Sequence, residues 1–219
     1  ETNQPNSITM PKLFSSWTRG VVLVLMFGAA FAVRLYCFSA PPLNFFPARQ
    51  YHSALIARHY YFRSSGKIPR WRRRVTRRSA SSQLTVEPRI YEYLISRIYC
   101  LAGESLSIPR LVSILCWLGG GVFLYLFGRR FFSQTAALTG TAFYLFAPYG
   151  IIASRSFQPN LPAMMSFLAA LLFLKKYLKT QSVRWLLPAA VSGALTLLLR
   201  PFALFPAATL AWALAAGWE

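Results

Sequence analysis

The sequence predicts an all-α protein, a polytopic transmembrane helix bundle with an extracytoplasmic loop that carries two interfacial amphipathic helices. Its composition is the first observation behind this fold. Of 219 residues, 55% are hydrophobic and only 13% are charged, whereas soluble domains average about 25% charged residues. The second observation is that stretches without Asp, Glu, Lys or Arg recur along the chain, and one long polar segment interrupts them. A helix of about 20 apolar residues crosses the hydrocarbon core of a bilayer, so these stretches predict a membrane protein.

The first predicted span covers residues 20–40 and follows a short N-terminus at 1–19. It contains Arg34, whose long side chain we expect to reach the membrane surface from the outer end of the span. A secretory signal peptide is the alternative, but residues 38–40 form a poor cleavage site and more apolar segments follow. We therefore expect this segment to remain in place as a signal anchor.

The segment 109–219 predicts transmembrane helices two to six. Each prediction depends on a stretch without charged side chains, and these stretches lie at 111–128, 131–154, 156–174, 185–199 and 201–218. Six spans would return the C-terminus to the side of the membrane on which the N-terminus lies. The chain ends directly after an apolar run, and we expect the bundle to be truncated C-terminally.

Basic residues in the short connections predict the orientation of the bundle. Lys and Arg gather at the N-terminus and in two turns, whereas the opposite turns hold only Arg155 and Arg200. The cytoplasmic set comprises Lys12, Arg19, Arg129, Arg130, Lys175, Lys176, Lys179 and Arg184. By the positive-inside rule, the N-terminus is then cytoplasmic and the loop at 41–108 is extracytoplasmic. The protein is expected to be integral to the plasma (inner) membrane.

The loop at 41–108 contains two amphipathic segments, near 47–63 and 88–102. Pro47 is a good first residue for the former helix, and apolar residues recur at helical spacing in both. Both are too short and too polar to span a bilayer, so they are predicted to lie along the membrane surface. The polar, Arg-rich link between them, residues 66–82, is predicted to be flexible.

The net charge of the chain indicates which kinds of molecule it can bind. Lys and Arg number 24 against five acidic residues, all glutamates, and the net charge of +19 predicts anionic partners. Residues 71–78 have the composition of a nucleic-acid patch, but the orientation places them across the membrane from nucleic acid, so anionic membrane lipids are the expected partner. His52 and His59 share a helix face without a further ligand, and aspartate is absent. Both observations argue against a bound divalent metal, while metal use and the oligomeric state stay open.

Three polar motifs stand out, two within the loop at 41–108 and one after the third predicted span. They read Pro41-Pro42-Leu43-Asn44-Phe45-Phe46-Pro47-Ala48-Arg49-Gln50, Glu87-Pro88-Arg89-Ile90-Tyr91-Glu92-Tyr93 and Gln158-Pro159-Asn160. Together with a first span that ends in an arginine, they resemble the GT-C superfamily of glycosyltransferases. The most similar branch depends on polyprenyl-phosphate sugars and includes protein O-mannosyltransferases and lipid A aminoarabinose transferases. The resemblance implies inverting transfer of a sugar from a polyprenyl-phosphate carrier to an acceptor on the extracytoplasmic face. Such relatives are usually more than twice as long, which suggests an N-terminal fragment or a shortened gene product.

The departures from the family pattern concern its acid and base groups. The family has a carboxylate, its proposed general base, where this chain has Asn44, and an amide cannot accept a proton at neutral pH. Phe46 replaces a histidine, and Asn160 replaces a glutamate. Glu87 and Glu92 are the remaining well-placed carboxylates, with Glu87 the candidate replacement in the catalytic role. The alternative for each is an ion pair with a neighbouring arginine.

The resemblance also implies roles for cations and for polar contacts. Arg49 and Arg58 would bind the donor phosphate, as would Arg155 and Arg200 at the outer ends of spans, because guanidinium groups match phosphate oxygens. Anchoring to lipid head groups is the alternative. Contacts to the acceptor or within the loop are expected from Gln50, Tyr91, Glu92 and Gln158.

Three classes of function remain after these assignments. With Asn44 at the position of the base, we expect an enzyme of weak activity or none. A non-catalytic, lipid-binding membrane subunit with the same fold is the alternative. A small transporter is disfavoured, because the later spans hold almost none of the ionisable residues that mark ion pathways.

Overall fold

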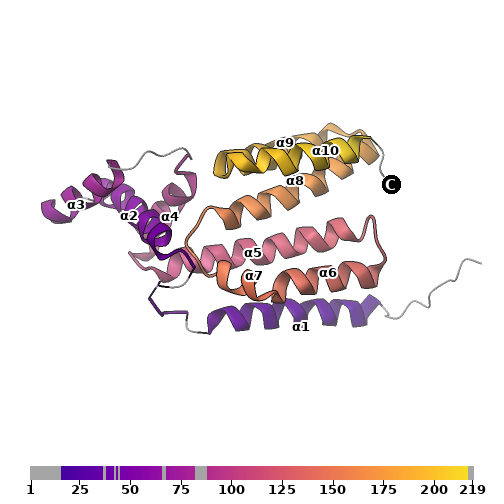
Figure 1. Cartoon of the computed structure of the whole chain (residues 1–219), viewed down its shortest axis with the longest axis horizontal. Helices are drawn as coiled ribbons and strands as arrows, with labels where there is room; N and C mark the ends of the chain where they lie inside the picture. The colour runs from indigo at the N-terminus through magenta and orange to yellow at the C-terminus, as the bar shows by residue number, and fades with distance from the viewer. Residues whose placement is uncertain are drawn as a thin grey trace, which may run out of the picture.

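The computed structural model describes residues 16–36, 38–41, 43, 45–65, 68–81 and 88–216, and every regular element within these ranges is a helix. This confirms the predicted all-α membrane bundle. Six helices lie side by side along most of the molecule (Figure 1), and their bounds are α1 Ser16–Leu35, α5 Ser107–Gly128, α6 Gln134–Phe146, α8 Asn160–Thr180, α9 Val183–Leu199 and α10 Leu204–Ala215. The short helix α7, Pro148–Ala153, continues the line of α6, and a 3₁₀ turn, Pro201–Ala203, joins α9 to α10.

Three of these helices are long and apolar enough to cross a membrane: Trp17–Leu35, Ser107–Gly128 and Asn160–Thr180, with 19, 22 and 21 residues. The other predicted spans form shorter helices within the described residues. The stretch at 131–154 is divided because Pro148 supplies no backbone N–H and Ala147 is extended, so α6 ends at Phe146 and α7 begins at Pro148. The total of six spans stays a prediction.

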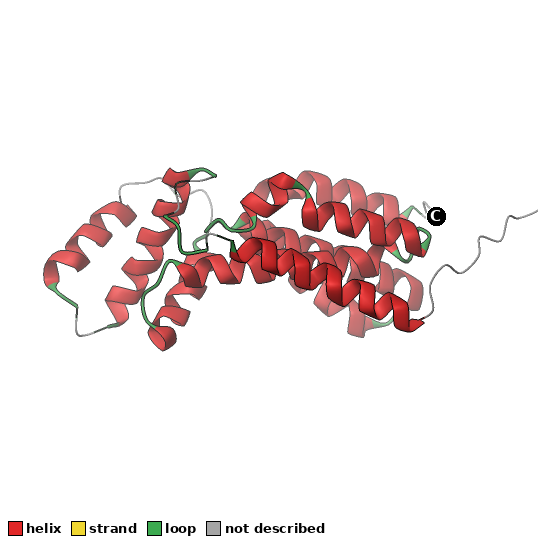
Figure 2. Ribbon diagram, turned by 90° about the horizontal axis from the view of Figure 1, so that it is seen from below, coloured by secondary structure: helices red, strands yellow, loops and turns green. Residues whose placement is uncertain are grey.

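Three further helices form a group beyond one end of the bundle, which we call the polar lobe (Figure 2). Their bounds are α2 Pro47–Ser64, α3 Arg70–Ser81 and α4 Ile90–Ala102. Helices α2 and α4 correspond to the two predicted amphipathic segments. The prediction of a flexible link between them was wrong for residues 70–81, which form α3. Arginine is a good helix former, and Pro69 fixes the entry into the helix, where its carbonyl accepts from the N–H of Arg72 at 3.1 Å.

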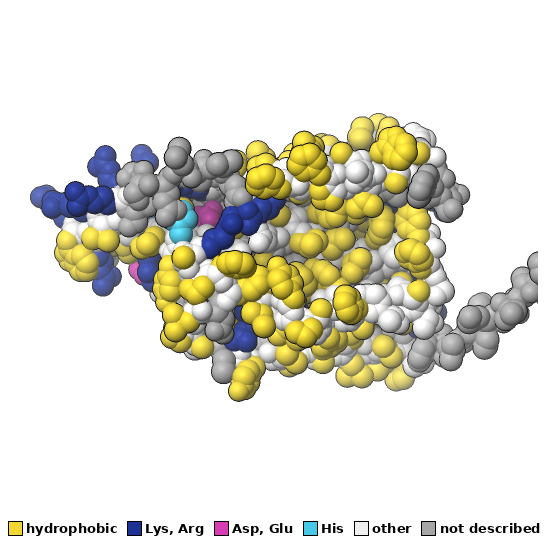
Figure 3. Space-filling view, in the orientation of Figure 1, with side chains coloured by type: hydrophobic (Ala, Val, Ile, Leu, Met, Phe, Trp, Pro, Cys, Tyr) yellow, Lys and Arg dark blue, Asp and Glu magenta, His cyan; other side chains and the backbone are white. Residues whose placement is uncertain are grey.

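A shared apolar core joins the polar lobe to the bundle. Ala54 and Ala57 of α2 and Ile95 of α4 are at most 1% exposed, and they pack in one cluster with Phe157 and Leu199 from the bundle. Positive charge is distributed unevenly over the two parts. Figure 3 shows Lys and Arg side chains gathered on the polar lobe, whereas the visible face of the bundle is mostly apolar.

The prediction that Arg34 reaches the membrane surface was wrong, because its side chain is fully buried inside the bundle at 0% exposure. Its Nε donates to Ser154 Oγ, and its two terminal nitrogens donate to the carbonyl oxygens of Ala30 and Leu145, all three at 2.7 Å. Leu145 lies in the last turn of α6, where carbonyl groups lack an intrahelical donor. The break between α6 and α7 thus creates an acceptor for the guanidinium group.

Candidate functional site

The described parts of the three motifs meet where the polar lobe joins the bundle. Asn44 and Glu87, the two predicted catalytic residues, lie outside the described residues. The residue after Asn44 is Phe45, and its carbonyl oxygen accepts hydrogen bonds from Gln50 Nε2 at 3.0 Å and from Gln158 Nε2 at 3.3 Å. Gln50 Oε1 in turn accepts from the backbone N–H of Phe157 at 3.3 Å. Both glutamines are buried, so the first motif is bound directly to the third.

The backbone at Phe45 and Phe46 adopts an unusual conformation. Their φ angles are 51° and 56°, in the left-handed region that aromatic residues rarely occupy. Phe46 is the N-cap of α2, and its carbonyl accepts from the N–H groups of Arg49 and Gln50. The ring of Phe45 packs edge-on against Tyr149 at 5.3 Å between centroids. Such backbone strain persists only where the surroundings fix it, and it is concentrated at functional sites.

The second motif packs against the residue just before the third motif, through Tyr91 and Phe157. Tyr91 is 2% exposed, and its ring meets Phe157 edge-on at 5.3 Å. Its hydroxyl lies 3.1 Å from the carbonyl oxygen of Pro109 and 2.8 Å from Ser113 Oγ. Burial raises the pKa of Tyr91 well above its usual range, so the phenol stays protonated and acts as a donor. Tyr91 therefore connects α4 to the start of α5.

Glu92 is also buried, and its Oε1 accepts a hydrogen bond from Ser53 Oγ of α2 at 2.8 Å. This bond joins the first and second helices of the predicted loop, and Ser53 was not singled out in the sequence. Gln158, 1% exposed, accepts from Asn160 Nδ2 at 3.2 Å, while Asn160 Oδ1 accepts from Arg200 Nε. The structure thus places Arg200, at the end of α9, directly on the third motif.

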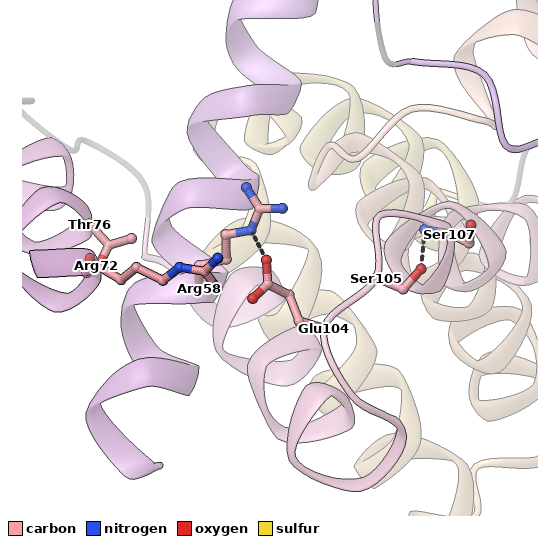
Figure 4. A network of polar contacts seen from close by, with 6 residues as sticks. All are labelled: Arg58, Arg72, Thr76, Glu104, Ser105 and Ser107. Atoms are coloured by element: carbon pink, nitrogen blue, oxygen red, sulfur yellow. Dashed lines mark hydrogen bonds and ion pairs between the residues drawn. The ribbon is translucent and has the colours of Figure 1, made fainter. Parts of the chain in front are cut away.

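Arg58 has a carboxylate partner that the sequence did not indicate. Its Nε lies 2.6 Å from Oε1 of Glu104, just beyond the end of α4 (Figure 4), and both side chains are under a third exposed. The two terminal nitrogens of Arg58 are turned away from Glu104. Glu104 lies 46 positions from Arg58, so only the packing of α2 against α4 reveals the pair.

The other predicted cations occupy separate elements. Arg49 lies exposed in the first turn of α2, and Arg155 is half-buried after α7. Arg110, which no sequence motif indicated, is 7% exposed at the start of α5 and donates to the carbonyl oxygen of Phe38 at 2.5 Å. It ties the end of the first span to the second. Among the described residues, no group of three His, Cys, Asp or Glu side chains forms a candidate metal site.

The fold and these contacts define the class of the protein: an all-α integral membrane protein with a polar site at one end of its helix bundle. A family model described as dolichyl-phosphate-mannose-protein mannosyltransferase matches residues 86–219, which is more than half of the chain. The chain therefore belongs to this family of membrane glycosyltransferases. The match includes the second and third motifs, at 87–93 and 158–160, and none of the first, which lies at 41–50. No curated protein and no solved structure shows significant similarity to the chain.

Proposed function

We propose that the chain transfers a sugar from a polyprenyl-phosphate carrier to an acceptor hydroxyl on the extracytoplasmic face of the plasma membrane. The family description names dolichyl-phosphate-mannose as the donor and protein as the acceptor, which supports a lipid-linked sugar donor here. The observation that carries the proposal is the pair of hydrogen bonds to the Phe45 carbonyl oxygen. They hold the residue next to Asn44 against the third motif.

In this reaction the acceptor oxygen forms a bond to the anomeric carbon as the bond to the carrier phosphate breaks. The leaving phosphate gains negative charge, which nearby guanidinium groups would stabilise. The proposed phosphate ligands are Arg49, Arg58, Arg155 and Arg200. The terminal nitrogens of Arg58, which point away from Glu104, support its part in this set.

The acceptor proton must pass to a base, and Asn44 cannot take it. We assign the role of the base to Glu87. We expect it to be a less effective base than the carboxylate that the family has at the position of Asn44. Gln50, Tyr91, Glu92 and Gln158 would hold the site in shape, because each is buried and bonded across two segments.

A transfer assay on the purified protein in lipid nanodiscs, with a polyprenyl-phosphate-linked sugar and an acceptor peptide, tests the proposal. Asn44→Asp should raise the rate by at least about tenfold, since general base catalysis contributes about 10²–10⁴-fold. Glu87→Gln should abolish the residual rate, whereas Glu104→Gln, which also removes one carboxylate, should not. Robust wild-type turnover that Glu87→Gln leaves unchanged and Asn44→Asp does not raise would contradict these roles.

A non-catalytic, lipid-binding subunit is the second candidate, and one contact favours it. Asn160, which stands where the resemblance implies a glutamate, is a neutral amide held between Gln158 and Arg200. Saturable binding of the donor without transfer in the wild type and in Asn44→Asp would support this candidate over the enzyme.

A further inference from the structure

A second polar site lies within the polar lobe, and none of its lining residues belongs to the three motifs. A cavity of about 470 Å³ opens between α2 and α3. It is lined by His59, Phe62, Arg63, Arg73, Thr76 and Arg77. None of these residues belongs to the proposed donor site. Figures 1 and 2 place α3 at the end of the lobe that is remote from the bundle.

The lining of this cavity is strongly cationic. Three arginines and one histidine share it, and in the described ranges no carboxylate forms an ion pair with Arg63, Arg73 or Arg77. The two described glutamates are engaged elsewhere, Glu92 with Ser53 and Glu104 with Arg58. Burial and the positive charge of Arg63, Arg89 and Arg77 lower the pKa of His59. Cations gathered in this way favour an anionic occupant.

Arg73 of α3 has one nitrogen that is hydrogen-bonded within the chain and one, Nε, that is buried without a partner among the described residues. One of its terminal nitrogens donates to the carbonyl oxygen of Ser65, the C-cap of α2, at 2.6 Å, which fixes the guanidinium group beside the cavity. Its Nε is buried and has no hydrogen-bond partner in the part of the chain that the structure describes. Buried donors of this kind are normally satisfied, so an oxygen acceptor from outside the chain fits here.

We infer that the α2–α3 cavity is a second phosphate-binding site, which takes a phosphomonoester dianion. Planar guanidinium groups match the oxygens of a phosphate, and three of them converge from two helices. The site binds an anion at a place separate from sugar transfer, so it does not depend on the proposed function.

Calorimetric titration of the full chain in phosphatidylcholine nanodiscs tests this inference. Glycerol 3-phosphate is the soluble probe, and nanodiscs that contain phosphatidic acid present the same phosphomonoester on a lipid. Saturable binding of the soluble probe identifies a free phosphate ester as the source. If glycerol 3-phosphate binds in phosphatidylcholine nanodiscs but not in nanodiscs with phosphatidic acid, the lipid head group competes for the cavity and is identified as its occupant. Both results support a phosphate site, and no binding of either probe overturns it.

A matched pair of double variants separates the cavity from general attraction to a basic helix. The first double variant is Arg73→Gln with Arg77→Gln, and the second is Arg72→Gln with Arg74→Gln. Each removes two charges from α3, but only the residues changed in the first line the cavity. The dissociation constant should rise by more than about tenfold in the first pair and stay within about twofold in the second. Equal weakening in both pairs would overturn the site. Arg63→Gln on α2, an exposed position, gives an independent variant should the first pair fail to fold.

Discussion

The side chains of Gln50 and Gln158, which are far apart in the sequence, donate to one acceptor, the carbonyl oxygen of Phe45. Gln50 lies in the first turn of α2 and Gln158 just before α8, so this oxygen is one of the points at which the polar lobe contacts the bundle. The acceptor belongs to a residue with a left-handed backbone. The two amides therefore stabilise a conformation that the local sequence disfavours.

We predict that the two glutamines are energetically coupled. Either Gln50→Ala or Gln158→Ala leaves the Phe45 carbonyl with one donor and should cost about 1 kcal/mol, whereas the double variant leaves it with none. The loss in the double variant should exceed the sum of the single losses by at least about 0.5 kcal/mol. Thermal unfolding in detergent measures this difference. Gln50→Ala combined with Gln134→Ala, at the far end of the bundle, serves as the additive control, and additivity in both pairs would refute the coupling.

Arg34 is predicted to be essential for the packing of the bundle. Arg34→Met removes three hydrogen bonds and leaves Ser154 and the Leu145 carbonyl without their donor, at about 1–3 kcal/mol for each buried group. We expect a strong decrease in the thermal midpoint and in monodisperse protein on size exclusion. Arg34→Lys, which keeps the charge but cannot span the three acceptors, should be intermediate. Arg130→Met, at an exposed position, should have little effect. A stable Arg34→Met variant would contradict the structural role.

Arg58→Gln and Glu104→Gln provide a matched pair of variants, because both break the same ion pair and only one removes a cation. The pair is partly exposed, so its loss should cost no more than about 1 kcal/mol in either variant. Binding of a lipid-linked sugar, measured by titration in nanodiscs, should weaken by more than about tenfold in Arg58→Gln and by less than about twofold in Glu104→Gln. If the two variants bind the donor equally well, Arg58 does not contact the phosphate.

We predict that His52 and His59 make the protein less stable in mild acid. Burial lowers the pKa of both below the ordinary value of 6.5, with Arg89 and Arg49 contributing at His52 and Arg63, Arg89 and Arg77 at His59. The unfolded chain then binds more protons than the folded protein just below this pH, so stability falls as the pH drops through about 6.5.

The thermal midpoint, measured between about pH 7.5 and 5.5, checks this sign. It should decrease more in the wild type than in the double variant His52→Gln with His59→Gln, since glutamine does not titrate. The same decrease in both proteins would show that other groups cause the acid sensitivity.

The helices of the bundle were largely predictable, because apolar stretches without charge carry a local signal. Helix α3 was missed for the opposite reason: its sequence is rich in arginine and poor in apolar residues, although Trp71 and Val75 stand at helical spacing and arginine itself favours helix. The site could be anticipated only as three separate motifs. The sequence did not indicate a role for Ser53, Glu104 or Arg110, because nothing in the neighbouring residues predicts their partners.

The sequence by itself determined the all-α class, the family and the basic character of the polar lobe, because these follow from composition, short-range pattern and motif. Only the tertiary structure decided that Arg34 is buried, since its partners Ser154 and Leu145 lie 120 and 111 residues away. The same holds for the shared acceptor of Gln50 and Gln158 and for the cationic cavity between α2 and α3. Hydrogen bonds and buried charges depend on which segments the packing of helices brings together, and that information is spread over the whole chain.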